Sequence, residues 1–132
     1  AALTGDARIN GVAFTGSTAT AMKIRANMAE HCAPGTPLIA ETGGLNAMIV
    51  DSTALPEHAV RDIINGAFRS AGQRCSALRV LYLQQDVADR MIEMLAGAMH
   101  ELRVGAPEWL STDIGPVIDA DALAVLRADA GE

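Results

Sequence analysis

Hydrophobic and polar positions along the chain predict strands that alternate with helices. The run Leu78–Leu83 is the most strand-like, because Val80 and Tyr82 alternate with Leu81 and Leu83. Shorter apolar runs predict three further strands, over residues 10–14, 38–40 and 47–50. Strands that alternate with helices indicate an α/β domain with a largely parallel sheet.

Apolar residues recur at helical spacing between and after these runs. The pattern predicts helices from residue 18 to about 32, from Pro56 up to Ala71, from about 87 to 102, and from Asp121 to the end of the chain. The expected buried face of the second helix consists of Val60, Ile63, Ile64, Ala67 and Phe68. That of the third consists of Met91, Met94, Leu95, Ala98, Met99 and Leu102.

Composition and charge exclude several classes of function. The 132-residue chain carries a net charge of -6 and has no basic cluster, which argues against contact with nucleic acid from this segment. Its apolar runs are too short to span a membrane. Two cysteines do not make a secreted disulfide framework, so we expect an intracellular, cytoplasmic setting. We also expect the chain to be a segment of a longer polypeptide.

A first candidate site follows the first strand, at Thr15-Gly16-Ser17-Thr18. A glycine permits a sharp turn there, and the free amide groups at the start of the next helix attract anions. Ser17 would donate a hydrogen bond to a phosphate. The alternative is a plain turn in which Ser17 or Thr18 is the helix N-cap, and the full three-glycine dinucleotide fingerprint is absent.

A second candidate is Glu41-Thr42-Gly43-Gly44, at the end of an expected buried strand. Partial desolvation there would make the Glu41 carboxylate a stronger base, which suits general-base catalysis. Gly43 and Gly44 would let a flat group approach the backbone. Alternatively, Glu41 faces solvent and the glycines only shape a turn.

The third candidate is Gly72-Gln73-Arg74-Cys75-Ser76, between a helix and a strand. Small and polar neighbours predict that Cys75 lies in an exposed loop, where Arg74 would favour the thiolate and backbone amides would stabilise an oxyanion. Cys32, late in a helix next to His31, has the character of an ordinary free cysteine that acts as a small buried hydrophobic residue. The histidines His31, His58 and His100 lack metal-ligand spacing, so no metal site is expected, and His58 and His100 are expected on helix surfaces.

The order and spacing of the three motifs resemble the aldehyde dehydrogenase superfamily. Gly115-Pro116-Val117-Ile118 also resembles a structural motif that follows the catalytic cysteine in that family. Residues 39–44, 46–51 and 70–80 are most similar to Δ1-pyrroline-5-carboxylate dehydrogenases, in particular to the dehydrogenase unit of the bifunctional proline utilization A proteins. The resemblance covers essentially the whole chain.

The resemblance implies NAD-dependent oxidation of glutamate semialdehyde, the ring-opened form of pyrroline-5-carboxylate, to glutamate. Cys75 would be the nucleophile and Glu41 the base that activates water. Gly16 and Ser17 would contact the cofactor pyrophosphate, and Gly43 and Gly44 would leave room for the nicotinamide. The substrate carboxylate would be bound by Ser76, with Arg74 assisting.

The resemblance also implies a domain organisation and partners. Residues 1–41 would end a Rossmann-like NAD-binding domain, residues 42–132 would belong to the catalytic domain, and the break would lie between Glu41 and Asn46. An upstream flavin-dependent proline dehydrogenase in the same polypeptide and a homo-oligomer are expected. Ala21 departs from the family pattern, since many members have glycine there, and further cofactor and substrate contacts of the family have no counterpart in this chain. The isolated chain is therefore expected to be inactive.

Three alternatives stay open at the level of sequence. The chain could belong to an aldehyde dehydrogenase for another semialdehyde. It could be a catalytically silent homologous domain, although Cys75 and Glu41 are both kept. It could also be a thiol redox sensor that pairs Cys75 with Cys32, which thiol labelling under mild oxidation would reveal.

Overall fold

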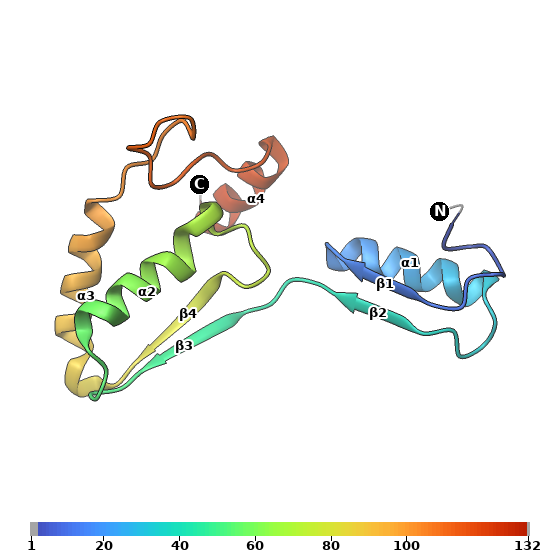
Figure 1. Ribbon diagram of the computed structural model, residues 1–132, viewed down its shortest axis with the longest axis horizontal. Coiled ribbons are helices and arrows are strands. Elements are labelled where there is room, and N and C mark those ends of the chain that lie inside the picture. Colours follow the sequence, from blue (N-terminus) through green and yellow to red (C-terminus); the bar gives the residue numbers. More distant parts are fainter. Residues whose placement is uncertain (1–2, 132) are drawn as a thin grey trace. The chain divides into compact units, whose positions relative to one another are not determined.

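The chain divides into two compact units, Ala1–Gly44 and Leu45–Glu132. The computed structural model describes residues 3–131. The unit boundary falls within the stretch where the sequence places a domain break, but the assignment of the units to a cofactor-binding and a catalytic domain stays a prediction. The described strands form two parallel pairs, and a helix connects the two strands of each pair, so the α/β fold class expected from the sequence is confirmed (Figure 1).

The first unit is a β–α–β unit. Strand β1 (Val12–Thr15) leads into helix α1 (Thr18–His31), which returns the chain to strand β2 (Leu38–Glu41) beside β1. Ala21 and Met28, two turns apart on one face of α1, are its buried residues. The two strands and the helix lie where the periodicity predicts them, and their first and last residues differ from the expected ones by at most two positions.

The expectation that β2 is buried is wrong. Only Leu38 of β2 is half-buried, and Ile39 is 64% exposed. The physical reason is that β2 belongs to a two-stranded pair, so within the described residues no second layer covers its other face. An apolar strand sequence indicates burial only when the sheet is wide enough to be covered on both sides.

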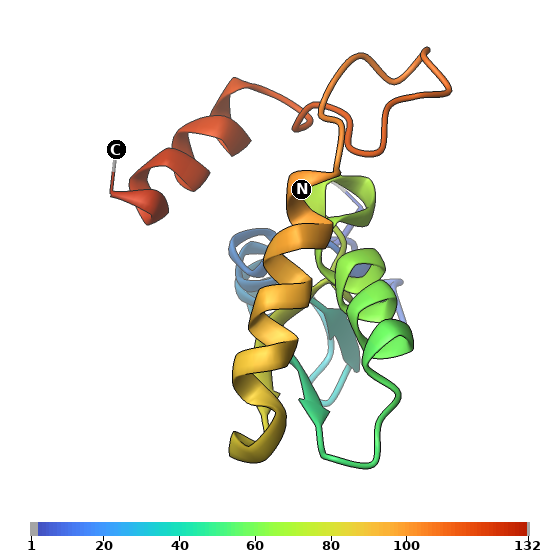
Figure 2. The ribbon, with the colours of Figure 1, turned by 90° about the vertical axis from the view of Figure 1, so that its left-hand side faces the viewer.

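The second unit pairs strand β3 (Asn46–Val50) with strand β4 (Leu78–Leu83). Helix α2 (Pro56–Phe68) and the short 3-10 segment η1 (Arg69–Gly72) connect the strands, and helix α3 (Gln85–His100) follows β4. The two helices lie side by side over one face of the sheet (Figure 2). The core between them and the sheet is centred on the buried residues Val50, Val60, Ile63 and Met91.

The strand periodicity read from the sequence is confirmed in β4. Leu81 and Leu83 pack on the core, whereas Tyr82 is 59% exposed on the opposite face. Tyr82 pairs with Ile49 of β3, which is 80% exposed. The second face of this sheet is therefore apolar and uncovered within the described residues.

The chain from residue 101 onwards forms a loop region and one more helix. An isolated parallel bridge joins Val104 to Ile114, and helix α4 (Ala120–Ala130) begins after its N-cap Asp119. The side chain of Asp119 accepts a hydrogen bond of 2.8 Å from the Ala122 N–H. In the part of the chain that the structure describes, no helix is both long and apolar enough to cross a membrane.

Candidate active site

Two of the three sequence motifs meet at one end of the first unit. Thr15 and Glu41 are register partners at the carboxyl ends of β1 and β2, and the Gly16 N–H donates a hydrogen bond of 3.1 Å to the Glu41 carbonyl oxygen. Ligands of parallel α/β sheets bind beyond the carboxyl ends of the strands. The fold thus places the Gly16-Ser17 segment beside the start of the Glu41-Thr42-Gly43-Gly44 segment.

Ser17 is the N-cap of α1. Its Oγ accepts a hydrogen bond of 3.1 Å from the Thr20 N–H and lies 2.9 Å from the Thr20 hydroxyl oxygen. The N–H groups of Thr18 and Ala19 donate no hydrogen bond within residues 3–131, and the first turn contains no acidic residue. This helix start therefore offers free amides and the positive end of the helix dipole to an anion.

Gly16 does not adopt a conformation that only glycine tolerates, and a side chain at this position would require the Phe14 ring to move. Its φ is not in the left-handed region, unlike those of Gly35 and Gly72. An added Cβ would lie 2.6 Å from the Phe14 ring. Ala21, the departure from the family pattern, is 7% exposed, so its methyl group is buried within its unit.

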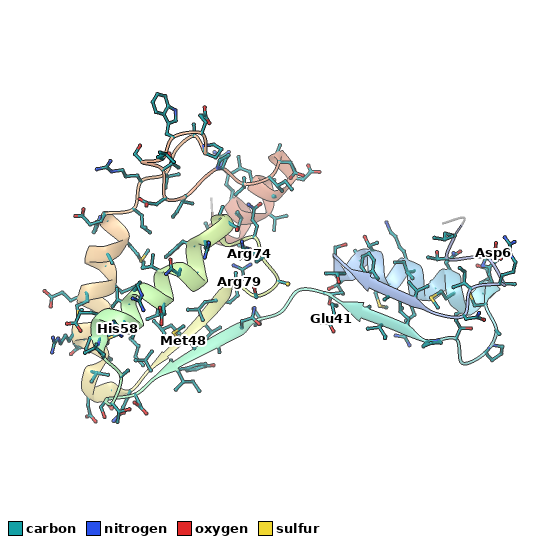
Figure 3. All side chains as sticks on the ribbon, viewed as in Figure 1. Asp6, Glu41, Met48, His58, Arg74 and Arg79 are labelled. Carbon is teal, nitrogen blue, oxygen red and sulfur yellow. The ribbon has the colours of Figure 1, made fainter. Side chains whose placement is uncertain are left out.

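Glu41 is exposed in its own unit (Figure 3). The expectation that Glu41 is partly desolvated is therefore wrong for this unit. The reason is that no second layer covers β2 within the described residues. Gly43 has open space around its Cα, since an added Cβ would meet nothing within 4 Å. The roles predicted for Glu41, Gly43 and Gly44 in catalysis and cofactor binding stay predictions.

Cys75 lies in a tight turn in the second unit. The Ala77 N–H donates a hydrogen bond of 3.1 Å to the Arg74 carbonyl oxygen, which closes the turn Arg74–Ala77 around Cys75 and Ser76. We call these four residues the Cys75 turn. The thiol is free and Cys75 is exposed, as the small and polar neighbours predict. Within residues 3–131 the N–H groups of Cys75 and Ser76 donate no hydrogen bond, so both are available to an oxyanion.

The backbone before the Cys75 turn is strained. Ser70 and Ala71 have φ values of 57° and 51°, and Gly72 follows with 66°. Each non-glycine residue in this left-handed region costs about 1–2 kcal/mol. An added Cβ at Gly72 would also lie 2.9 Å from the Ala67 carbonyl oxygen, so glycine is required there by both conformation and space.

Side chains hold the segment on both sides of Cys75. Gln73 Oε1 accepts a hydrogen bond of 2.9 Å from the Ile118 N–H, and Asn46 Nδ2 donates to the carbonyl oxygens of Cys75 and Ala77 at 2.6 and 3.0 Å. Gln73 and Asn46 belong to motifs that the sequence shows, but the sequence indicates no role for either residue. The only local signal is that Asn46 is a polar residue at the start of an apolar strand.

A cavity of about 260 Å³ borders the Cys75 turn. It is lined by Asn65, Gly66, Arg69, Arg74, Ser76 and Ala77. Neither Arg69 nor Arg74 has an ion-pair or hydrogen-bond partner for its guanidinium among the described residues. The structure thus brings the two residues predicted to bind substrate, Arg74 and Ser76, to one cavity that contains donors and no carboxylate.

None of the other singled-out residues belongs to the Cys75 turn. Cys32 is half-buried at the end of α1, with its Sγ 3.7 Å from the Thr4 carbonyl oxygen. His58 and His100 are exposed on α2 and α3, which confirms the expectation from their helical context. Among residues 3–131, no group of three or more His, Cys, Asp or Glu side chains is arranged to hold a metal ion.

The first unit thus contains a helix start with free amides, and the second unit contains an exposed free cysteine in a tight turn. The model of the aldehyde dehydrogenase family matches residues 1–128. The chain belongs to this family.

Within this family, the chain is similar to individual proteins of known name. The chain is 62% identical over 125 residues to the bifunctional protein PutA of Klebsiella aerogenes. This match covers 92% of the chain and 10% of that protein. It is 37% identical over 116 residues to the 1-pyrroline-5-carboxylate dehydrogenase of Anoxybacillus flavithermus, covering 84% of the chain and 22% of that protein. The chain thus spans about a tenth of the length of the PutA protein that it matches.

Solved structures share the same fold. The proline utilization A (PutA) D778Y mutant of Bradyrhizobium japonicum superposes with a TM-score of 0.92 at 57% identity, over 98% of this chain and 13% of that one. Betaine aldehyde dehydrogenase of Staphylococcus aureus in complex with NAD+ superposes with a TM-score of 0.90 at 28% sequence identity. The match covers 98% of this chain and 25% of that one. Both units of the chain therefore have the local architecture of aldehyde dehydrogenases.

Proposed function

We propose that this chain is the catalytic segment of an NAD-dependent dehydrogenase that oxidises glutamate semialdehyde to glutamate in proline catabolism. The observation that carries the proposal is Cys75, an exposed thiol in a tight turn whose neighbouring amides are free. The similarity to PutA proteins and to a 1-pyrroline-5-carboxylate dehydrogenase supports the choice of substrate.

The reaction begins at Cys75. Its thiolate adds to the aldehyde carbon and forms a thiohemiacetal, and the former carbonyl oxygen takes the negative charge. The Cys75 N–H, which has no partner among residues 3–131, donates to that oxygen. Donors already fixed in place stabilise developing charge without reorganising, which is why such amides lower the barrier.

The cofactor site is assigned to the start of α1. Its free amides at Thr18 and Ala19 and the absence of acidic residues in its first turn suit a pyrophosphate. Gly16 and Ser17 would hold that group, and Gly43 and Gly44 would lie beside the nicotinamide. When bound, NAD accepts the hydride that leaves the thiohemiacetal carbon, which leaves a thioester on Cys75.

Hydrolysis completes the cycle. Glu41 takes a proton from water, the resulting hydroxide adds to the thioester carbonyl, and the C–S bond breaks to release the carboxylic acid and the Cys75 thiolate. Glu41 is exposed in its own unit, so water reaches it. Two different residues thus serve the two half-reactions.

The charged end of the substrate is assigned to the cavity beside the Cys75 turn. A carboxylate there would accept hydrogen bonds from the Ser76 hydroxyl and the Arg74 guanidinium, both of which line the cavity. In the whole polypeptide, a flavin-dependent proline dehydrogenase unit upstream would supply the substrate, as the bifunctional relatives suggest. A homo-oligomer is also proposed for the whole protein.

The test is NADH formation by the full-length polypeptide supplied with pyrroline-5-carboxylate. We expect Cys75→Ala to abolish turnover and Glu41→Gln to stop it after hydride transfer, so that an acyl adduct on Cys75 accumulates in the mass spectrum. Matched controls are Cys32→Ala, the other free thiol, and Glu57→Gln, an exposed glutamate on α2.

The outcomes separate the parts of the proposal. Turnover of other aldehydes but not of this substrate, still lost in Cys75→Ala, would retain the chemistry and refute the substrate. Activity that survives in Cys75→Ala would refute the nucleophile. A thiol redox sensor would instead show a Cys32–Cys75 crosslink under mild oxidation.

A further inference from the structure

The side chain of Asn46 makes two hydrogen bonds to the backbone of the Cys75 turn. Asn46 is the first residue of β3, and its Nδ2 donates to the carbonyl oxygens of Cys75 and Ala77, at 2.6 and 3.0 Å. The two acceptors are carbonyls, so only the amide nitrogen can face them, and the orientation of the amide is fixed by the contacts themselves.

These hydrogen bonds determine where the free amides of the turn point. A trans peptide directs its C=O and the following N–H in opposite directions. Because Asn46 holds the Cys75 carbonyl, the Ser76 N–H is directed away from Asn46. In the same way, the Ala77 N–H holds the Arg74 carbonyl, which directs the Cys75 N–H away from the inside of the turn.

The strand that follows the turn is irregular at this point. Asn46 pairs with Leu78, but Ala47 pairs with Val80, so Arg79 is an extra residue in β4. Such bulges occur beside active sites, where they redirect a side chain or end the pairing. The Cys75 turn therefore lies between the left-handed residues Ser70–Gly72 on one side and the bulge at Arg79 on the other.

We propose that Asn46 is a positioning residue for Cys75: it fixes the backbone of the Cys75 turn so that the amides of Cys75 and Ser76 keep the direction needed to bind the oxyanion. Asn46 touches neither substrate nor cofactor in this role. The inference rests on the proposed function of Cys75 as nucleophile.

The test compares two Asn46 variants in the full-length polypeptide. Asn46→Asp keeps the size of the side chain but places carboxylate oxygens against two carbonyl oxygens, and Asn46→Ala removes the contact. We expect kcat for aldehyde oxidation to fall by about 10- to 100-fold, the effect of misplacing reacting groups by about 1 Å. KM for NAD should not change, because the start of α1 is untouched.

A second readout separates positioning from loss of the thiol. Alkylation of Cys75 by iodoacetamide needs an exposed thiolate but no oriented amide, so its rate should stay within about threefold of the wild type while kcat falls at least about tenfold. A proportional fall of both rates would overturn the proposal.

The matched control is Gln84→Ala. Gln84 Oε1 accepts a hydrogen bond of 2.8 Å from the Ser52 N–H, so it is a side-chain amide clamp at the opposite end of the same two strands. We compare all variants at equal distances below their own unfolding temperatures. An equal loss of kcat in Gln84→Ala would show that Asn46 is merely structural.

Cys75→Ala distinguishes the two levels of failure. If Cys75→Ala abolishes oxidation and both Asn46 variants retain the wild-type kcat, only the positioning role fails. If Cys75→Ala remains active, Cys75 is not the nucleophile, and the proposed positioning role of Asn46 is refuted as well.

Discussion

Gln73 and Ile118, 45 residues apart in the chain, are joined by a hydrogen bond of 2.9 Å from the Ile118 N–H to Gln73 Oε1. Gln73 precedes the Cys75 turn, and Ile118 ends the Gly115-Pro116-Val117-Ile118 motif. The contact explains in physical terms why a motif far downstream accompanies the cysteine motif. It attaches an otherwise exposed segment to the backbone just before the Cys75 turn.

We predict that this hydrogen bond protects the Ile118 amide from hydrogen exchange. Gln73→Ala removes the acceptor and should accelerate exchange in a peptide that contains Ile118, by about 2- to 10-fold for a bond worth about 0.5–1.5 kcal/mol. Gln73→Glu keeps an acceptor oxygen and should retain the protection. Mass spectrometry of the full-length protein measures both, and equal exchange in all three proteins would contradict the prediction.

Removing the Arg74 charge should affect acidic substrates selectively. We expect Arg74→Gln to raise KM for the acid semialdehyde by about 10- to 100-fold, because a hydrogen bond to a charged group is worth about 1.5–3 kcal/mol. A neutral aldehyde such as butanal should be oxidised as before. Steady-state kinetics with both substrates makes the measurement.

Arg61→Gln is the control for Arg74→Gln. Arg61 lies on α2, outside the cavity, and its Nε is 3.3 Å from the Asp62 carboxylate. Replacement of this paired surface charge should leave both KM values unchanged. An equal effect of the two substitutions would mean that the overall charge acts, and not the cavity.

The two possible roles of Ser17 are separable by substitution. Ser17→Ala removes the N-cap of α1 and should lower the stability of the first unit by about 0.5–2 kcal/mol. Ser17→Asp keeps an N-cap but adds a negative charge where the pyrophosphate would bind. We therefore expect normal thermal stability but a KM for NAD raised by about tenfold or more in Ser17→Asp. An unchanged KM would leave Ser17 as a cap alone.

The uncovered face of the β3–β4 sheet should make the isolated 132-residue chain associate. Ile49 and Tyr82 are cross-strand partners that are 80% and 59% exposed. Exposed apolar faces and unpaired strand edges favour aggregation. Light scattering should decrease in an Ile49→Thr, Tyr82→Thr double variant, which keeps β-branched or strand-compatible residues on the face.

A control for this prediction is replacement of an exposed apolar residue elsewhere. Leu110 lies in the loop region and is fully exposed, but it belongs to no strand pair. Leu110→Thr should not reduce scattering to the same extent. A sharp, cooperative melt of the isolated wild-type chain as a monomer would contradict the prediction.

Much of the local structure was predictable because it depends on neighbours in the chain. Val60 and Ile63 recur at helical spacing on α2, Met91 lies on the apolar face expected for α3, and all three are buried against the β3–β4 sheet. The exposure of Cys75 followed from small and polar neighbours. Burial of β2 was not predictable, since it depends on how many layers cover a strand rather than on the strand's own residues.

The sequence by itself determined the parallel α/β class, the periodicity of its elements and the family motifs, because these are fixed by residue type at short spacing. Only the tertiary structure decided that Asn46 holds the Cys75 carbonyl, that Gln73 reaches Ile118, and that Arg74 and Ser76 share a cavity. Hydrogen bonds between residues 29 or 45 positions apart depend on strand register and turn geometry. Neither leaves a periodic trace in the sequence, so the contacts around the Cys75 turn form only when the chain is folded.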